Sequence, residues 1–136
     1  MQNLIFGTHR GRASLTLDPL IKPALVAGQK LPCDFLEYVV DVAQACRERG
    51  VKTVAVSAGY ISPEPRLEFF RHIDAANIDL KGFTEGFYKK LCSGKLAAVL
   101  ETLEYLKYES NVWFEITTLL IPGENDSTVE IEAESA

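Results

Sequence analysis

The sequence has 136 residues, is 47% hydrophobic and carries a formal net charge of −5, which suits one globular domain with its own core. Its 14 lysine and arginine residues are scattered along the chain, which argues against nucleic acid as a partner. No apolar run approaches the roughly 20 residues that cross a bilayer, and no signal-peptide pattern opens the chain, so a cytoplasmic protein without a membrane partner is expected.

The first 33 residues are predicted to be mostly irregular, because glycine or proline interrupts them every few positions. From residue 34 the pattern changes to an amphipathic helix, with an apolar stripe that includes Val39 and Ala43 and with Gly50 placed to end it. We therefore divide the chain into an irregular segment, 1–33, and a folded part, 34–136.

The folded part alternates strands with helices. Strands are predicted at 51–57, 77–81 and 112–120, from short β-branched or alternating runs. A helix opened by Ser62 and Pro63 follows the first strand, with an inner stripe that includes Leu67. Helices at 84–91 and 95–109 follow the second, and Ser127 with Glu130 has the spacing of a capping box.

Alternating strands and helices predict a parallel sheet covered by helices. Only three strands are clear, whereas a closed barrel of eight βα units needs about 250 residues. The predicted fold class is therefore α/β, a partial TIM-barrel fragment of about three parallel βα units after an irregular N-terminal segment.

Each predicted strand has one polar side, which is unusual because strands covered on both faces are normally apolar throughout. Alternation places Asn77, Asp79 and Lys81 on one side of the second strand. Glu115 and Thr117 share a side of the third strand, and Thr53 and Ser57 share a side of the first. We interpret these as one polar surface facing a ligand; a structural ion pair of Lys81 with a carboxylate is the alternative.

Other kinds of site find less support. His9 and His72 have no neighbours at metal-ligand spacing, and no metal ligands are assigned. Ser57 and Ser62 lack the Gly-x-Ser-x-Gly elbow of a hydrolase nucleophile. Glycine-rich phosphate-binding patterns are also missing from the sequence.

Three segments together carry a resemblance to a known family: FLEYVVDVAQACRERGVKTVAVSAGYISPEP, HIDAANIDLKGFTEGFYKKLCSG and VWFEITTLLIPGENDS. They closely resemble the radical S-adenosylmethionine (SAM) enzymes of the AmmeMemoRadiSam system, relatives of the pyruvate formate-lyase activating enzymes. The resemblance runs from about Pro32 to the last residue, and its most specific parts are AGYI, NIDLK and TTLLIPGxNDS.

The resemblance implies a partial TIM barrel in which a [4Fe-4S] cluster cleaves SAM to a 5'-deoxyadenosyl radical. It also implies that Asp79 and Lys81, the candidate catalytic residues, reach toward SAM or substrate. The cofactor-binding residues that it implies include these two and lie at the ends of all three strands: Ser57, Ala58, Gly59, Tyr60, Asp79, Lys81, Glu115, Thr117 and Thr118.

The chain departs from the family at its cluster motif, because it contains no CxxxCxxC. Cys33, Cys46 and Cys92 have spacings of 13 and 46, so we expect no cluster binding and no catalysis by this chain alone. QKLP also stands where the family has an acidic YNEP-like segment. We expect a foreign or frame-shifted N-terminal part and a truncation at the other end.

Two alternatives to a radical SAM function stay open. The first alternative is a non-catalytic α/β fragment that acts through association at unpaired sheet edges. The second is an aldolase-type lyase. In the second case Lys81 would form a Schiff base, polarised by Asp79.

Overall fold

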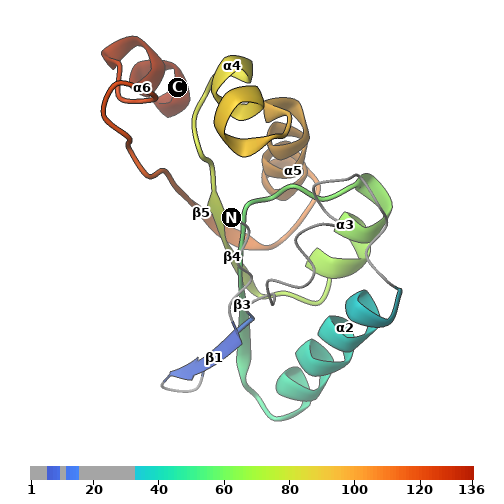
Figure 1. Ribbon diagram of the computed structural model, residues 1–136. Coiled ribbons are helices and arrows are strands. Elements are labelled where there is room, and N and C mark those ends of the chain that lie inside the picture. The colour runs from blue at the N-terminus through green and yellow to red at the C-terminus, as the bar shows by residue number, and fades with distance from the viewer. Residues whose placement is uncertain (1–5, 10–11, 16–32) are drawn as a thin grey trace.

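A computed structural model describes residues 6–9, 12–15 and 33–136, with side chains from residue 36 onward (Figure 1). Five strands form one sheet in the order in which they occur in the chain. They are β1 (Phe6–His9), β2 (Arg12–Leu15), β3 (Lys52–Ser57), β4 (Ala75–Asp79) and β5 (Trp113–Thr117). Neighbouring strands from β2 to β5 are parallel, and β1 pairs antiparallel with β2.

The predicted α/β fold is confirmed, with the three expected strands adjacent and parallel in the middle and at one edge of the sheet. The segment 1–33 was expected to be irregular, but it contributes β1 and β2, which extend the sheet beyond β3. The rest of that segment, up to residue 32, lies outside the described residues. Alternation and β-branching were too weak in two four-residue strands to reveal them.

The connections between the strands are helical. They are α2 (Cys33–Glu48), α3 (Pro63–Phe70), the short α4 (Glu85–Phe87) with a turn of π-helix, η2 (Tyr88–Cys92), then α5 (Leu96–Tyr108) and α6 (Thr128–Ser135). Figure 1 shows α2, α3 and α5 on the same side of the sheet. None of the helices that the structure describes has the length and apolar composition required to cross a membrane.

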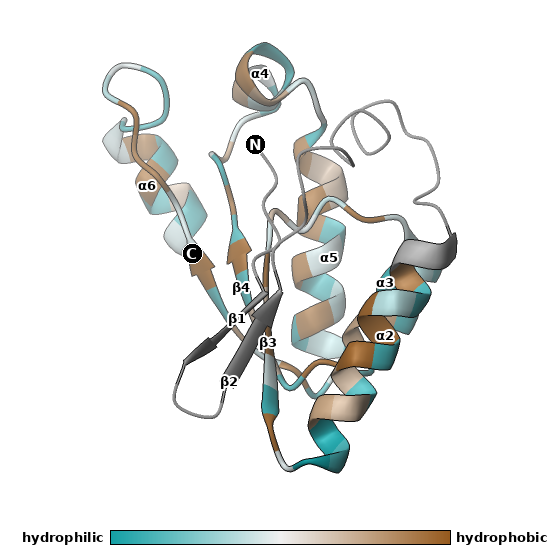
Figure 2. Cartoon of the chain, turned by 60° about the horizontal axis from the view of Figure 1, so that its bottom comes forward, coloured by the Kyte–Doolittle hydropathy of each residue, from teal (hydrophilic) through white to brown (hydrophobic). Residues whose placement is uncertain are grey.

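The core lies between this side of the sheet and the three helices (Figure 2). The strands contribute Ala55, Ala76 and Ile78, each at most 1% exposed. The two alanines let the helices approach the strands closely, and larger side chains fill the space between them. The helices contribute to this core Val39, Ala43, Phe70, Val99, Leu103 and Leu106.

Most of the predicted helix ends are confirmed by their local geometry. Gly50 has a φ of 69° just after α2, in the left-handed region that glycine adopts without strain. The Thr84 hydroxyl accepts a hydrogen bond from the Phe87 amide at 3.2 Å and so caps α4. Ser62 occupies the expected position before α3, but its hydroxyl makes no capping hydrogen bond.

Two details of the helix predictions were wrong. Leu67 was expected on the inner stripe of α3 but is 51% exposed, and the side chains that this helix buries are Phe69 and Phe70. The Ser127 hydroxyl caps α6 by accepting from the Glu130 amide at 3.3 Å, but the Glu130 carboxylate does not complete the box. It accepts instead from the Phe83 amide at 2.7 Å, which ties α6 to the chain after β4.

Candidate functional site

A polar surface runs over the adjoining ends of β4 and β5, on the side of the sheet away from the core. Parallel pairing sets Asn77 level with Glu115 and Asp79 level with Thr117, so these side chains share one face. The Asn77 side-chain amide donates to the Glu115 carboxylate at 2.8 Å and to the Thr117 hydroxyl at 2.8 Å. Asn77 therefore joins the two strands across this face, which we call the polar face: Asn77, Asp79, Lys81, Glu115 and Thr117.

Lys81 forms an ion pair with Asp79 at the end of β4. The Lys81 side chain is 26% exposed and the Asp79 side chain 33% exposed, so both charges remain in reach of a ligand in solution. The arrangement presents a paired cation and anion at the end of the strand. The Schiff-base role of Lys81 stays a prediction.

The polar face does not extend to β3 as expected. Val56 is level with Asn77, and Ser57 is level with Ile78, so Ser57 belongs to the core side of the sheet. Thr53 also lies on the core side, 1% exposed, with its hydroxyl 3.1 Å from the Asp74 carboxylate. The prediction that Thr53 and Ser57 share the polar face was wrong, because alternation groups residues by side without fixing which side the helices cover.

Asp74 explains how a polar residue is accommodated in the core at Thr53. Its carboxylate accepts from the Thr53 amide at 2.9 Å, and Lys52 lies 2.7 Å away. Burial tends to raise the pKa of Asp74, but the hydrogen bonds from Lys52 and Thr53 and the charge of Lys52 outweigh it, and the net pKa is lowered. The group links the starts of β3 and β4, far from the polar face.

The turn after β3 lies at the same end of the sheet as Asp79, and it is built mainly by local contacts. The Ser57 hydroxyl accepts from the Gly59 amide at 3.1 Å, and Ala58 is buried. Gly59 has a φ of 67°, and a Cβ at this position would lie 3.0 Å from Cγ2 of Ile78. The half-buried Tyr60 ring packs against Gly94, where a Cβ would lie 3.2 Å from it. Each of these residues therefore has a packing or hydrogen-bonding role within the protein that does not depend on a ligand.

Thr118 is the first residue after β5, and its contact differs from that of Thr117. The Thr118 hydroxyl donates to the Glu134 carboxylate on α6, so it fastens the last helix instead of extending the polar face. Of the residues predicted for the site, the structure therefore brings together Asp79, Lys81, Glu115 and Thr117. The residues of the β3 turn lie at the same sheet end, and Thr118 is engaged with α6.

Two residues next to Lys81 received no site role from the sequence. Tyr88 accepts from the Lys81 amide at 3.1 Å, and Asn125 donates to the Lys81 carbonyl at 2.8 Å. Burial raises the pKa of Tyr88 to about 12, so its phenol is protonated at neutral pH. Tyr88 gives no signal of its own within a helical run. Asn125 belongs to the family-like segment TTLLIPGxNDS, but that motif does not reveal its contact with Lys81.

The two cysteines whose side chains the structure describes, Cys46 and Cys92, do not come together at one site. Cys46 lies near the end of α2, just before β3 begins, whereas Cys92 follows the opposite, C-terminal end of β4. A cluster needs three thiolates converging on one point. Among residues 36–136, no group of three or more His, Cys, Asp or Glu side chains is placed to hold a metal ion. Burial raises the pKa of the Cys92 thiol, which favours the protonated form over the thiolate ligand.

Comparisons with known proteins place this geometry in context. No protein-family model matches the chain. An uncharacterized protein of Methanocaldococcus jannaschii, MJ0808, is 38% identical over 96 residues, which are 71% of this chain but 28% of that protein. The chain therefore spans less than a third of this curated relative.

A solved structure shares the fold. It is the crystal structure of a domain of pyruvate-formate lyase-activating enzyme from Bacteroides vulgatus, with a TM-score of 0.67 and 19% sequence identity. The match covers 74% of this chain and 62% of that one. The fold expected from the resemblance is thus confirmed: the chain is a partial βα fragment with the fold of a pyruvate-formate lyase-activating enzyme domain.

Proposed function

We propose that the chain is the SAM-binding part of a radical SAM enzyme of the AmmeMemoRadiSam type, and that it binds SAM without cleaving it when alone. The observation that supports this most is the continuous polar face on β4 and β5, joined by the contacts of Asn77 with Glu115 and Thr117. It lies at the C-terminal ends of parallel strands, where folds of this kind place their ligands.

The charges of the polar face suit the chemistry of SAM. The ligand carries a sulfonium and an ammonium group, for which Glu115 and Asp79 offer carboxylates, and a carboxylate, for which Lys81 offers an ammonium. Exposed pairs of this sort contribute modestly one at a time, but several aligned groups give orientation. We assign these three residues to ligand binding.

Reductive cleavage of SAM would require a cluster that the described cysteines do not fit. The cluster supplies the electron in the enzymes that this sequence resembles, and Cys46 and Cys92 lie at opposite strand ends. A cluster would therefore need at least two thiolates from outside residues 36–136. We therefore assign SAM binding to this chain and do not assign SAM cleavage to it.

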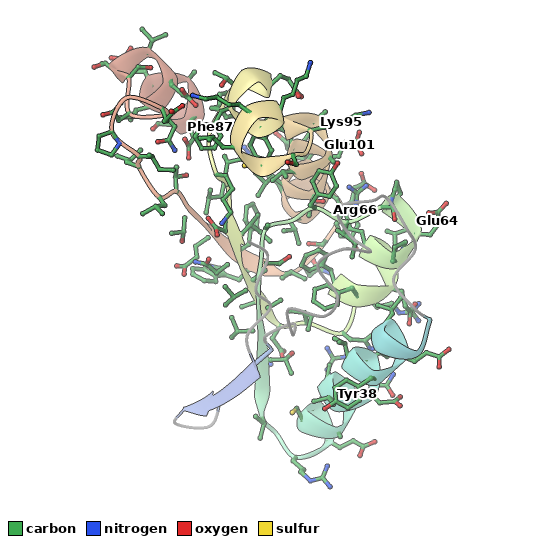
Figure 3. All side chains as sticks on the ribbon, in the orientation of Figure 1. Tyr38, Glu64, Arg66, Phe87, Lys95 and Glu101 are labelled. Atoms are coloured by element: carbon green, nitrogen blue, oxygen red, sulfur yellow. The ribbon has the colours of Figure 1, made fainter. Side chains whose placement is uncertain are left out.

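The substitution Glu115→Gln tests the proposal. It removes one carboxylate from the polar face while keeping an acceptor for Asn77, so we expect SAM to bind about fivefold more weakly, on the order of 1 kcal/mol. Isothermal titration calorimetry of the full chain with SAM at low salt measures the change. Glu101→Gln is the matched control, because Glu101 is exposed on α5, on the core side of the sheet (Figure 3).

Two outcomes of this titration would contradict SAM binding at the polar face. If titration of the wild-type protein with SAM gives no heat of binding at any concentration tested, SAM is excluded as the ligand. Equal affinities for the Glu115→Gln and Glu101→Gln proteins would show that SAM binds away from the polar face.

We also propose that copies of the chain associate through the outer edge of β5. Along the described chain β5 pairs with β4 on one side, and no further strand covers its other edge. Trp113 is 65% exposed and Ile116 46% exposed, and apolar residues continue from the strand into the following segment (Figure 2). An open edge flanked by apolar side chains favours strand pairing with another chain.

Association predicts a mass above that of a monomer in size-exclusion chromatography with light scattering. Ile116→Lys places a charge at the edge and should shift the protein toward the monomer, because charged edge residues oppose pairing. Val129→Lys is the control, since Val129 is 77% exposed on α6 and does not belong to the edge strand. A compact monomer for the wild-type chain at all concentrations, or equal effects of the two substitutions, would rule out this surface.

A further inference from the structure

The backbone N–H and C=O groups of Lys81 are both hydrogen-bonded to buried side chains. Its amide donates to the Tyr88 hydroxyl at 3.1 Å, and its carbonyl accepts from the Asn125 side chain at 2.8 Å. Lys81 lies two residues beyond the end of β4, and the last pair of the ladder joins Asp79 to Thr117. The sheet therefore does not fix the Lys81 peptide, and these two side chains supply hydrogen bonds that a strand neighbour would otherwise give.

Tyr88 is itself rigidly placed. It is 3% exposed, and its ring meets the Phe87 ring edge-on with centroids 6.3 Å apart. The Tyr88 carbonyl also accepts from the Gly94 amide at 3.2 Å, which closes the turn after the π-helix. A protonated phenol in this position is a fixed acceptor for one amide, that of Lys81.

Asn125 fixes the other side through the segment that follows β5. It is 1% exposed, and its amide nitrogen also donates to the Leu119 carbonyl at 3.0 Å. Its oxygen accepts from the Ile121 amide at 2.6 Å. One side chain thus shapes the loop and attaches it to Lys81, 44 positions earlier in the chain.

We propose that Tyr88 and Asn125 are positioning residues for Lys81, which hold its peptide so that its ammonium group stays against Asp79 in the polar face. Their contacts with Lys81 are to its backbone, and the side chain is directed as a consequence. The importance of this for ligand binding rests on the proposed SAM-binding function. The positioning itself does not, and it can be measured without a ligand.

The test is the rate at which a limiting amine reagent labels Lys81 relative to Lys89 in the same sample, read by mass spectrometry of the full chain. Lys89 is an exposed lysine on the neighbouring π-turn and reports any general loosening of it. Tyr88→Phe removes one hydroxyl, and Lys81 should then leave the ion pair more often, so we expect its relative labelling to rise about fivefold. Asp79→Asn, which removes the partner, calibrates the full effect.

Tyr105→Phe is the matched control, a buried tyrosine on α5 whose ring packs against Phe70. Asn125→Ala should raise the relative labelling as Tyr88→Phe does; if this variant does not fold, Tyr88→Phe decides alone. The inference is overturned if Asp79→Asn raises the ratio and Tyr88→Phe leaves it at the Tyr105→Phe value. A raised ratio in a protein that does not bind SAM would support the positioning and refute the proposed function.

Discussion

Gly59→Ala should destabilise the chain by about 2–4 kcal/mol, one of the largest effects expected from adding a single methyl group. Gly59 has a φ of 67°, which costs any other residue energy, and an added Cβ would lie 3.0 Å from Cγ2 of Ile78 and 3.4 Å from Cγ1 of Val99. Ile78 is 0% exposed and branched at Cβ, so it has little freedom to move aside. The midpoint of urea unfolding, followed by circular dichroism, measures the loss.

Gly50→Ala separates the two causes. Gly50 has a φ of 69°, close to that of Gly59, but no heavy atom lies within 4 Å of its added Cβ. Only the backbone term then applies, so this control should lose about 1 kcal/mol. If both variants lose the same free energy of unfolding, the turn after β3 can shift without disturbing Ile78. Its close packing under α5 would then contribute little to stability.

This packing changes how the AGYI sequence is understood. The resemblance assigned Ser57, Ala58, Gly59 and Tyr60 to a cofactor edge, and the structure gives each of them a contact within the protein. The buried Ala58 and the left-handed Gly59 bring the chain close to the core, and Tyr60 covers Gly94. The role of these four residues at a cofactor edge stays a prediction.

The sequence predicted the polar face on β4 and β5 well because the alternation there is strict. Asn77 and Asp79 alternate with Ile78 and Leu80, which are 0% and 1% exposed, so the polar and buried sides coincide with the two faces of the sheet. On β3 the same reasoning failed. Beyond Lys52 at its start, both faces of that strand carry small or apolar residues, and Thr53 is buried because Asp74 satisfies its hydroxyl.

The contacts that surround Lys81 could not be predicted from local patterns. Tyr88 directly follows the short helix α4. At such a position the hydrophobic pattern of the sequence does not distinguish a tyrosine from a phenylalanine, so it does not reveal a role for the hydroxyl. Asn125 stands in the polar stretch PGENDS, in which every residue suits an exposed turn. Its burial depends on the loop folding back over the end of β4, a long-range arrangement that no spacing rule describes.

Asn125→Ala should release the segment after β5, because it removes all three hydrogen bonds of the Asn125 side chain at once. The Ile121 amide loses its acceptor, and the carbonyls of Lys81 and Leu119 lose their donor. Buried groups left unpaired in this way cost about 1–3 kcal/mol each, so detaching the loop into water becomes the cheaper outcome. We expect hydrogen exchange at the Ile121 amide to accelerate about 100-fold, since that corresponds to roughly 3 kcal/mol of lost local stability.

Asn111→Ala provides the control for this loop, because Asn111 is an exposed asparagine in the turn before β5. Exchange in the segment 119–125 should match the wild type in that protein, and exchange in β4 should change little in either variant. Unchanged exchange at Ile121 in Asn125→Ala would show that the loop is held by its other ties, the ion pair of Lys90 with Glu124 at 2.7 Å and the contact of Glu130 with the Phe83 amide. In that case Asn125 would not be what joins the end of β5 to Lys81, and the polar face would owe its shape to β4 and β5 alone.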